Sequence, residues 1–317
     1  MKISIVVTVF NEKANIANLL ESLLVQTKKP DEIVIVDGGS QDKTIEIIKH
    51  FQKKEKRIKL LVEKCSRAQG RNLGIDISRN EIVALTDAGC VPNKHWFGRI
   101  TKPFVNKEVD VVAGFYKMTG ETAFQKALSF YLGVLPSQFD TNYLPSTRSV
   151  AIKKETWLEV GGFPEKLKGT AEDTVFNYRL VQSGANIARV KNAQVEWGIP
   201  RTLRKAFNKI FLYAKGDAQS KIWWHPSKKL SSHNIKVLFV LVRYAFGLVG
   251  LILAFSSPLL WFVLLLGLFL YIFWSFRKVY VEFGDYKIGM WGIILQFTSD
   301  FAVMSGFLTG IFAREEH

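Results

Sequence analysis

Cysteine is scarce in this chain of 317 residues, which contains only Cys65 and Cys90. Two cysteines cannot form a disulfide framework or a cysteine-rich metal cluster, and the chain has no Asn-x-Ser/Thr glycosylation sequon. The composition therefore excludes the small disulfide-stabilised secreted domains and is consistent with a reducing compartment.

Glycine is absent where two common phosphate-binding motifs need it. The first apolar run, ISIVVTVF, leads into NEKANI without a glycine, so it cannot form the G-x-G-x-x-G turn that holds a dinucleotide. Because this run is short and ends at charged residues, it predicts a strand and not a signal peptide. No G-x-x-x-x-G-K-Ser/Thr motif is present either. Any phosphate must be held by another device, and a cation bound to Asp87 is the candidate.

Charge is absent from residues 244–276, a stretch of 33 residues without Asp, Glu, Lys or Arg. One helix of that length would measure about 50 Å at about 1.5 Å per residue, whereas the hydrocarbon core of a bilayer is about 30 Å thick. The sequence Ser-Ser-Pro at 256–258 favours a break and predicts two membrane-spanning helices. With a third apolar stretch, the predicted spans cover residues 237–255, 259–276 and 288–313. The alternative is a buried helical hairpin in a soluble protein.

Asp300 is the only charged residue of the third apolar stretch. An acid in such a stretch is costly unless it has a partner or faces a polar cavity. Two interpretations remain open. Either Asp300 pairs with Arg243 of the first span, or the last segment lies partly in the membrane interface.

Positive charge is in excess, with 43 Lys and Arg against 28 Asp and Glu and a formal net charge of +15. Such an excess points to nucleic acid, an anionic membrane surface or phosphorylated substrates. The chain lacks the interleaved aromatic and basic residues of a nucleic-acid-binding sheet, so no nucleic acid is predicted as a partner. By the positive-inside rule, six cations place both flanks of the first two spans in the cytosol: Lys228, Lys229, Lys236, Arg277, Lys278 and Lys287. We therefore predict a cytosolic domain over residues 1–230, a membrane domain over 231–317 and a C-terminus on the far side.

Short apolar runs alternate with helical patterns in the first part of the chain. The runs ISIVVTVF, EIVIV, IKLLV and EIVALT have the length of buried strands, and apolar stripes at helical spacing lie between them. This alternation predicts an α/β fold with a doubly wound, mostly parallel sheet. Ligands of such sheets bind beyond the carboxyl ends of the strands. Asp37 and Asp87 follow the second and fourth strands, so we expect both to face one crevice.

The second half of the predicted domain carries fewer signals. We expect a helix near residues 123–135, a strand at RSVAIKK and a helix at AEDTVFNYRL, whose first turn holds Glu172 and Asp173. The helix dipole favours carboxylates there, so capping alone would explain the pair. Residues 200–215 form a basic amphipathic pattern, which is typical of a helix in the headgroup plane or of an ordinary surface helix.

These segments resemble, in order, the motifs of the inverting family 2 glycosyltransferases, whose GT-A domain binds a nucleotide sugar. SIVVTVFNEKANI is similar to the family's opening strand and turn, EIVIVDGGSQDKT to its D-G-S-x-D-x-T loop, and RAQGRNLGI to its A-R-N-x-G helix start. LTDAGC takes the place of the D-x-D motif, and GGFPEKLKGTAEDTVFNYRL that of the element with the base. Five motifs in one order, over residues 3–197, make the resemblance specific.

The resemblance implies a nucleotide site at the ends of the strands. Asp37 corresponds to the residue that accepts hydrogen bonds from the nucleobase, with Thr8 and Glu12 near the same pocket. Arg71 corresponds to a nucleotide-binding arginine, and the alternative for it is a structural ion pair. Asp87 corresponds to the first acid of D-x-D and would hold the nucleotide through a divalent cation, Mg²⁺ or Mn²⁺.

The resemblance also implies one catalytic base. Asp173 corresponds to the carboxylate that removes the proton from an acceptor hydroxyl, which is a poor nucleophile at neutral pH. A metal ion and basic side chains would stabilise the charge on the departing diphosphate. Four residues are predicted as possible contacts of the phosphates or the acceptor: Arg67, Glu172, Arg201 and Arg204.

The sequence departs from the family pattern in two places. Gly89 stands where D-x-D has its second acid. Either Asp87 alone anchors the cation, with diphosphate and water as further ligands, or metal dependence is reduced, and we favour the first alternative. After Trp197, RTLRKAF stands in place of the Q-x-x-R-W motif of processive synthases, which favours the addition of a single sugar.

The resulting expectation is a membrane-anchored glycosyltransferase of the hexosyltransferase type. It would move one sugar, with inversion, from a cytosolic nucleotide diphosphate sugar to a lipid-linked or cell-surface glycan acceptor at the cytoplasmic (inner) membrane. Two alternatives remain. One is a polyprenyl-phosphate glycosyl synthase, whose ionised acceptor scarcely needs a base, and the other is an inactive nucleotide-sugar-binding scaffold.

Overall fold

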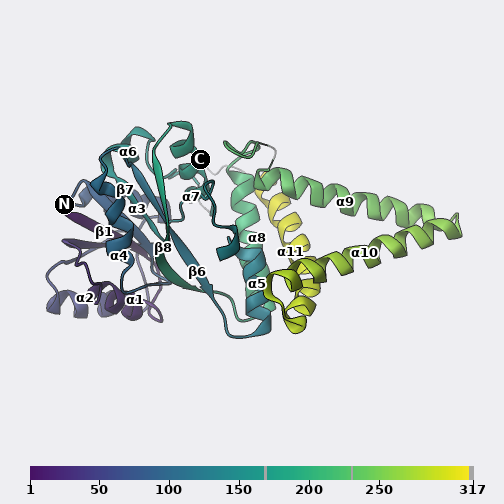
Figure 1. Cartoon of the computed structure of the whole chain (residues 1–317), viewed down its shortest axis with the longest axis horizontal. Helices are drawn as coiled ribbons and strands as arrows, with labels where there is room; N and C mark the ends of the chain where they lie inside the picture. The colour runs from purple at the N-terminus through teal and green to yellow at the C-terminus, as the bar shows by residue number, and fades with distance from the viewer. Residues whose placement is uncertain (168–169, 230, 314–317) are drawn as a thin grey trace. The chain divides into compact units, whose positions relative to one another are not determined.

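The structure, a computed structural model, describes residues 1–167, 170–229 and 231–313 (Figure 1). Its contacts divide the chain into two compact units. Apart from the residues that are not described, the first unit comprises Met1–Met118, Pro136–Lys168 and Glu172–Gly198, and the second comprises Thr119–Leu135, Gly169–Ala171 and Ile199–His317.

Four parallel strands form one half of the sheet in the first unit. They are β1 (Ile3–Val9), β2 (Glu32–Asp37), β3 (Ile58–Val62) and β4 (Ile82–Asp87). β1 pairs with β2 and β4, and β2 pairs with β3. The helices that connect them are α1 (Ile16–Leu24), α2 (Thr44–Lys54) and α3 (Arg67–Ile77). α3 approaches the sheet so closely that a Cβ atom on Gly74 would lie 2.5 Å from Val6.

Antiparallel strands extend this sheet. β7 (Val150–Lys153) pairs with β4, β6 (Val111–Thr119) with β7, and β5 (Cys90–Pro92) with β8 (Ile187–Gly198). The eight-stranded order is β3-β2-β1-β4-β7-β6-β8-β5. The remaining short elements are α4 (Trp96–Thr101), η1 (Lys102–Val105), η2 (Pro136–Gln138), α6 (Lys154–Glu159) and α7 (Glu172–Gln182). The predicted α/β fold is confirmed, with a mixed sheet.

The strand register fixes which residues share the carboxyl edge of the parallel strands. Thr8 of β1 is the register partner of Asp87 on β4, and the next residue, Val9, is the partner of Asp37 on β2. Neighbouring strands lie about 4.8 Å apart. Both aspartates therefore end strands on either side of β1 at one edge, where a doubly wound sheet binds its ligands.

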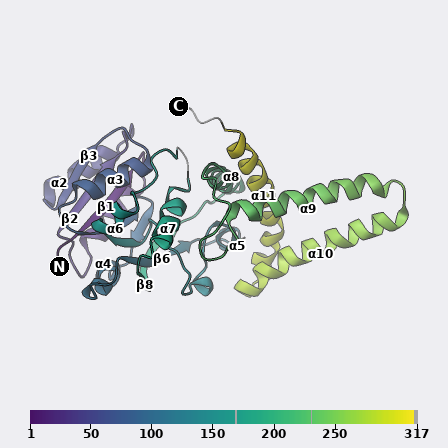
Figure 2. The ribbon, with the colours of Figure 1, turned by 90° about the horizontal axis from the view of Figure 1, so that it is seen from above.

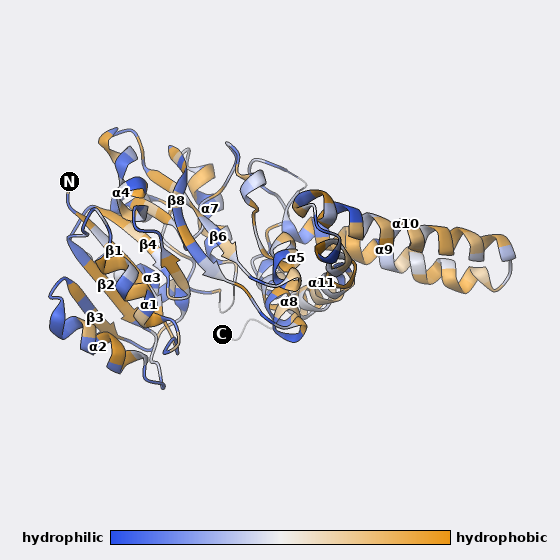
Figure 3. Ribbon diagram, turned by 60° about the horizontal axis from the view of Figure 1, so that its bottom comes forward, coloured by the Kyte–Doolittle hydropathy of each residue, from blue (hydrophilic) through white to orange (hydrophobic). Residues whose placement is uncertain are grey.

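The second unit is helical. It contains α5 (Ala123–Leu132), α8 (Leu203–Gln219), α9 (His233–Ala254), α10 (Pro258–Phe283) and α11 (Tyr286–Phe312). By length and composition, α9, α10 and α11 could each cross a membrane. α9 and α10 form a hairpin (Figure 2) that is apolar along most of its length (Figure 3). α10 extends beyond residue 276 to Phe283 and ends at Gly284, whose φ of +65° is left-handed. The domain boundary at residue 230 stays a prediction.

Candidate active site

Asp37 ends β2 and is fully buried. Its Oδ1 atom accepts hydrogen bonds from the backbone N–H groups of Gly39 (3.0 Å) and Ser40 (2.7 Å), which shape the following loop. Gly39 has a φ of +92°, a conformation that glycine adopts without strain. The Oδ2 atom is buried and has no hydrogen-bond partner among the described residues. A buried acceptor without a donor is costly. That a nucleobase N–H donates to this atom remains a prediction.

Thr8 and Glu12 lie beside this loop. Thr8 is partly buried in β1, next to Asp87 in the register. Glu12 follows β1, and its backbone N–H donates to Thr44 Oγ1 (2.8 Å) at the start of α2. Its carboxylate accepts from Asn15 Nδ2 (2.7 Å). The structure thus brings Thr8 and Glu12 to the same edge as Asp37, and their contact with a nucleotide remains a prediction.

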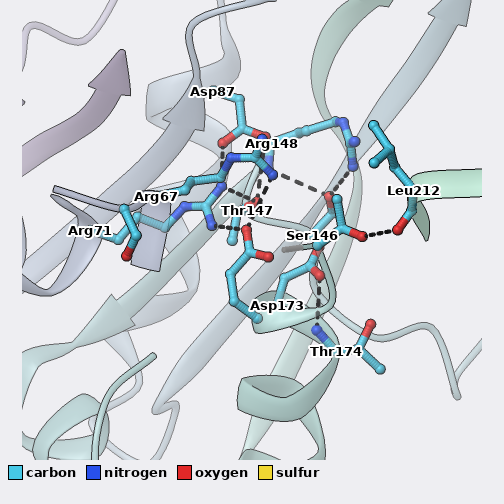
Figure 4. Close-up of polar contacts among 12 residues, drawn as sticks. Arg67, Arg71, Asp87, Ser146, Thr147, Arg148, Asp173, Thr174 and Leu212 are labelled. Carbon is cyan, nitrogen blue, oxygen red and sulfur yellow. Dashed lines mark hydrogen bonds and ion pairs between the residues drawn. The ribbon is translucent and has the colours of Figure 1, made fainter. Parts of the chain in front are cut away.

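Arg71 is buried at the centre of an ion-pair cluster (Figure 4). Its Nη2 atom lies 2.9 Å from Asp87 Oδ1 and 3.1 Å from Thr147 Oγ1, and its Nη1 atom lies 2.7 Å from Glu172 Oε1. The guanidinium group also faces the ring of Phe163, at 5.5 Å. These contacts occupy the cationic fork, so the geometry favours the structural-ion-pair alternative for Arg71 over direct phosphate binding.

Asp87 is held ionised by this cluster. Desolvation favours its protonated form, but the guanidinium groups of Arg71 and Arg148 outweigh desolvation and keep the pKa of Asp87 below its usual value. The side chain is 27 % exposed. Among the described residues, the hydrogen-bond contact of its Oδ2 atom is a long one, 3.4 Å to Thr147 Oγ1. One carboxylate oxygen is thus fixed by Arg71, and the other is available to a ligand.

This donor set fits a cation that brings most of its own ligands. Within the described part of the chain, no cluster of three or more His, Cys, Asp or Glu side chains could hold a metal ion. Mg²⁺ in phosphate sites is commonly bound by one or two carboxylates together with substrate phosphates and water. The ionised Asp87, with its available Oδ2 atom, meets the protein's part of that requirement.

Gly89 offers a direct test of the predicted cation site at Asp87. A Cβ atom at this position would meet no heavy atom within 4 Å, and the backbone is not left-handed, so a larger residue fits. We expect Gly89→Asp to lower the Mn²⁺ concentration for half-maximal nucleotide binding about tenfold, which corresponds to about 1.4 kcal/mol, because a second carboxylate adds a ligand for the cation. Gly89→Ala is the steric control. Identical Mn²⁺ titrations of the two variants would argue against a cation at Asp87.

Glu172 and Asp173 begin α7 but lie in different environments. Glu172 is buried and bound to Arg71, so more than helix capping holds it in place. Asp173 is partly exposed, and its Oδ1 atom accepts from the backbone N–H of Thr174 (2.9 Å). Desolvation, and then the negative charge of Glu172, raise the pKa of Asp173 above its usual value. A carboxylate with a raised pKa is a better proton acceptor, which suits a general base.

Arg148 is a site residue that the sequence analysis missed. Its guanidinium group lies 3.9 Å from the ring centroid of Trp197 and 5.1 Å from that of Tyr116, and it donates to Ser146 Oγ (3.0 Å). Its positive charge acts to lower the pKa of both Asp87 and Asp173, but at Asp173 desolvation and Glu172 outweigh this contribution. No spacing in the sequence marks Arg148, because its aromatic neighbours come from β6 and β8, far away along the chain.

We expect Arg148→Gln to move the acid limb of the kcat profile to higher pH. Without the cation, the ionised form of Asp173 is less stable, so its pKa rises further and more of it is protonated at a given pH. Arg148→Lys keeps the charge and should leave the limb near its wild-type position. The measurement is kcat from about pH 5 to about pH 9. An unchanged limb in the Gln variant would mean that Arg148 does not act on the ionisation of Asp173.

The other predicted contacts divide between the two units. Arg67 begins α3 and is 55 % exposed, with its Nη1 atom 3.4 Å from Glu172 Oε1. Arg67 therefore lies at the site, and more than half of its side-chain surface is exposed to solvent. Arg201 and Arg204 are exposed at the start of α8, in the second unit. Their contact with phosphates remains a prediction.

Comparison with known proteins agrees with this arrangement. The model of glycosyl transferase family 2 matches residues 4–162. Glycosyltransferase AglE of Haloferax volcanii is 30 % identical over 251 residues, which are 76 % of this chain and 81 % of AglE. Glycosyltransferase GlyG of Streptococcus pneumoniae is 30 % identical over 116 residues, 36 % of this chain and 38 % of GlyG.

A solved structure shares the fold over nearly the whole chain. It is the mannosyltransferase PcManGT from Pyrobaculum calidifontis in complex with GDP-Man and Mn²⁺, with a TM-score of 0.72 and 17 % sequence identity. The match covers 98 % of this chain and 87 % of PcManGT. With the matching family model, the relative of similar length and the GT-A-type sheet, these findings show that the chain is a glycosyltransferase that belongs to glycosyl transferase family 2.

Proposed function

We propose that the chain moves one sugar, with inversion, from a nucleotide diphosphate sugar to a lipid-linked or cell-surface glycan acceptor. The observation that carries this proposal is the contrast between two carboxylates of one polar cluster. Asp87 has a lowered pKa and Asp173 a raised one. Carboxylates whose environments push their pKa values apart are suited to different roles. We assign Asp87 the role of a charged ligand for the sugar donor, and Asp173 the role of the base that takes the proton of the sugar acceptor.

Asp173 acts as the general base in this mechanism. Its carboxylate takes the proton of the acceptor hydroxyl as the oxygen attacks the anomeric carbon, and the bond from that carbon to the diphosphate breaks. One displacement inverts the anomeric configuration, so no second carboxylate is needed as a nucleophile. Asp87 would hold a divalent cation, which when bound neutralises charge on the diphosphate. Arg71 keeps Asp87 ionised and in place, and Asp37 receives the nucleobase.

The acceptor is proposed to be presented at the cytoplasmic membrane. The apolar helices α9 and α10 support attachment, and the cations at their flanks favour a cytosolic catalytic domain. PcManGT is described with GDP-Man and Mn²⁺, which supports a nucleotide diphosphate sugar and a divalent cation as ligands here. The presence of the Asp173 carboxylate favours a hydroxyl acceptor over the polyprenyl phosphate of the alternative synthase, because an already ionised phosphate scarcely needs a base.

The test is a transfer assay with the full chain in proteoliposomes. A panel of nucleotide diphosphate sugars is combined with Mn²⁺ and membrane lipids that carry either a glycan or a polyprenyl phosphate. NMR of the product then reports the anomeric configuration. We expect one donor to give a product of inverted configuration. A product of retained configuration would contradict the mechanism, and nucleotide binding without any transfer would favour the inactive scaffold.

A further inference from the structure

α11 differs from the other two apolar helices in its surroundings. In its most apolar stretch of 18 residues, 39 % is buried, whereas the corresponding share is 11 % in α9 and 6 % in α10. Figures 1 and 2 show the reason: the α9–α10 hairpin extends away from the other helices of the second unit, whereas α11 runs across the base of the hairpin beside α5 and α8. The length and composition of α11 alone do not reveal that it is more buried than α9 and α10.

Helices α5 and α8 cover one side of α11 over most of its length. Near the start of α11, the ring of Trp291 meets that of Phe124 of α5, at 5.1 Å. Near its end, a Cβ atom on Gly306 would lie 2.3 Å from the carbonyl oxygen of Phe211, and one on Gly310 would lie 2.4 Å from that of Lys215. From residue 291 to residue 310 a helix rises about 28 Å. This length is close to the thickness of the hydrocarbon core, about 30 Å.

The covering helices carry charges that do not belong in hydrocarbon. Their cations are Lys126 of α5 and Arg204, Lys205, Lys209 and Lys215 of α8. A cation at the centre of a bilayer is energetically costly. Because α5 and α8 lie along α11, a membrane-crossing α11 would carry several of these cations into the core.

The middle of α11 is tied to the hairpin by a buried polar network. Asp300 is 2 % exposed, and its carboxylate accepts hydrogen bonds from Arg243 Nη2 (2.8 Å), Tyr244 Oη (3.0 Å) and Gln296 Nε2 (2.8 Å), and also from Tyr271. The pairing of Asp300 with Arg243 is thus present. The Arg243 side chain remains 40 % exposed, which suits the headgroup level better than the core.

The opposite side of α11 is apolar and exposed. Met290 is 43 %, Phe301 54 %, Leu308 43 % and Phe312 78 % exposed. One side therefore packs on charged helices and holds a polar network, while the other presents large apolar side chains along the whole helix. α11 is apolar around most of its own circumference, so the polar side of a membrane-surface assembly is supplied by the charged helices α5 and α8 that pack on it and by the Asp300 network.

We propose that α11 lies in the plane of the membrane surface, with its exposed apolar side chains at the boundary of headgroups and acyl chains, and does not cross the bilayer. Both ends of α11 are then on the cytosolic side, which replaces the expectation of a C-terminus on the far side. This inference rests on the proposed membrane attachment and goes beyond it. It makes α5, α8 and α11 one surface platform around the base of the hairpin.

The test measures the depth of three positions along α11. Met290→Cys, Phe301→Cys and Phe312→Cys are introduced into the full chain with Cys65→Ala and Cys90→Ala, labelled with bimane and reconstituted into liposomes. The lipids carry bromine either near the headgroup or near the end of the acyl chain. For an in-plane helix, we expect bromine near the headgroup to quench all three labels about equally, and more strongly than deep bromine. Strongest deep quenching at Phe301, with weak deep quenching at both ends, would overturn the proposal.

Phe255→Cys, in the exposed turn of the hairpin, separates this inference from the proposed attachment. A label there that no brominated lipid quenches would mean that the hairpin does not enter the membrane, whatever α11 does. If the protein with Cys65→Ala and Cys90→Ala fails to bind the sugar donor, a second variant is used instead. This variant carries Ala313→Cys and keeps both native cysteines. An impermeant maleimide should then modify residue 313 from the same side of the membrane as Cys65, and modification from the opposite side would overturn the proposal.

Discussion

Asp173→Asn should reduce kcat by about three orders of magnitude while the donor still binds, because loss of a general base costs roughly 10²- to 10⁴-fold. The amide has nearly the shape of the carboxylate and keeps an oxygen that can accept from Thr174 N–H, so α7 should begin as before. The measurements are transfer rate at saturating donor and donor affinity by calorimetry, both with the full chain.

Asp76→Asn is the matched control for this substitution. Asp76 is exposed near the end of α3 in the same unit, so the kcat of the Asp76→Asn variant should stay at the wild-type value. If Asp173→Asn kept wild-type turnover, Asp173 would not be the base. Equal losses in the Asp173 and Asp76 variants would mean that the assay reports general damage to the fold.

Arg71→Met should lower the free energy of unfolding by about 3 kcal/mol, near the lower end of the range for breaking a buried ion pair. The substitution leaves the buried Glu172 and the partly exposed Asp87 without their shared cation. Glu172 Oε2 already has no hydrogen-bond partner among the described residues, so its carboxylate would be poorly compensated. The measurement is equilibrium unfolding of the first unit within the full chain, followed by a fluorescent label on that unit.

The pH dependence distinguishes this cause from a simple loss of packing. Without Arg71, the pKa of Asp87 rises, because desolvation disfavours its ionised form and the guanidinium group no longer opposes that effect. Protonation then relieves the cost at low pH, so the destabilisation should be smaller near pH 5 than near pH 8. Arg67→Met removes a 55 % exposed cation from the same cluster and should cost less than about 1 kcal/mol. A pH-independent loss in Arg71→Met would contradict the charge explanation.

The parallel half of the sheet was predictable because its signals are local. β1, β2 and β4 are short apolar runs with helical stripes between them, and the rule on ligand sites of doubly wound sheets places Asp37 and Asp87 at one edge. The strand register confirms that Asp37 and Asp87 lie at the same edge of the sheet, on either side of β1. The bounds of α9 and α11 also lie close to the predicted spans, because uninterrupted apolar sequence is a strong local signal.

Of the antiparallel strands, β7 was predicted at RSVAIKK, whereas β5, β6 and β8 were not. β6 and β8 contain charged or polar residues as well as apolar ones, and their pairing depends on strands that lie far away in the sequence. Arg148 was missed for the same reason, since only the folded sheet brings Tyr116 and Trp197 to its guanidinium group. The surroundings of α11 likewise depend on α5 and α8, which lie far before it in the chain.

Nucleotide-dependent thermal stabilisation is the most direct test of the proposed cation site at Asp87. Wild-type protein and Asp87→Asn are heated with nucleoside diphosphates, with and without Mn²⁺, since a ligand that binds the folded state raises the melting temperature. We predict stabilisation of the wild type that requires Mn²⁺ and is largely lost in Asp87→Asn. Equal stabilisation of both proteins, or stabilisation that is the same without Mn²⁺, would contradict a cation site at Asp87.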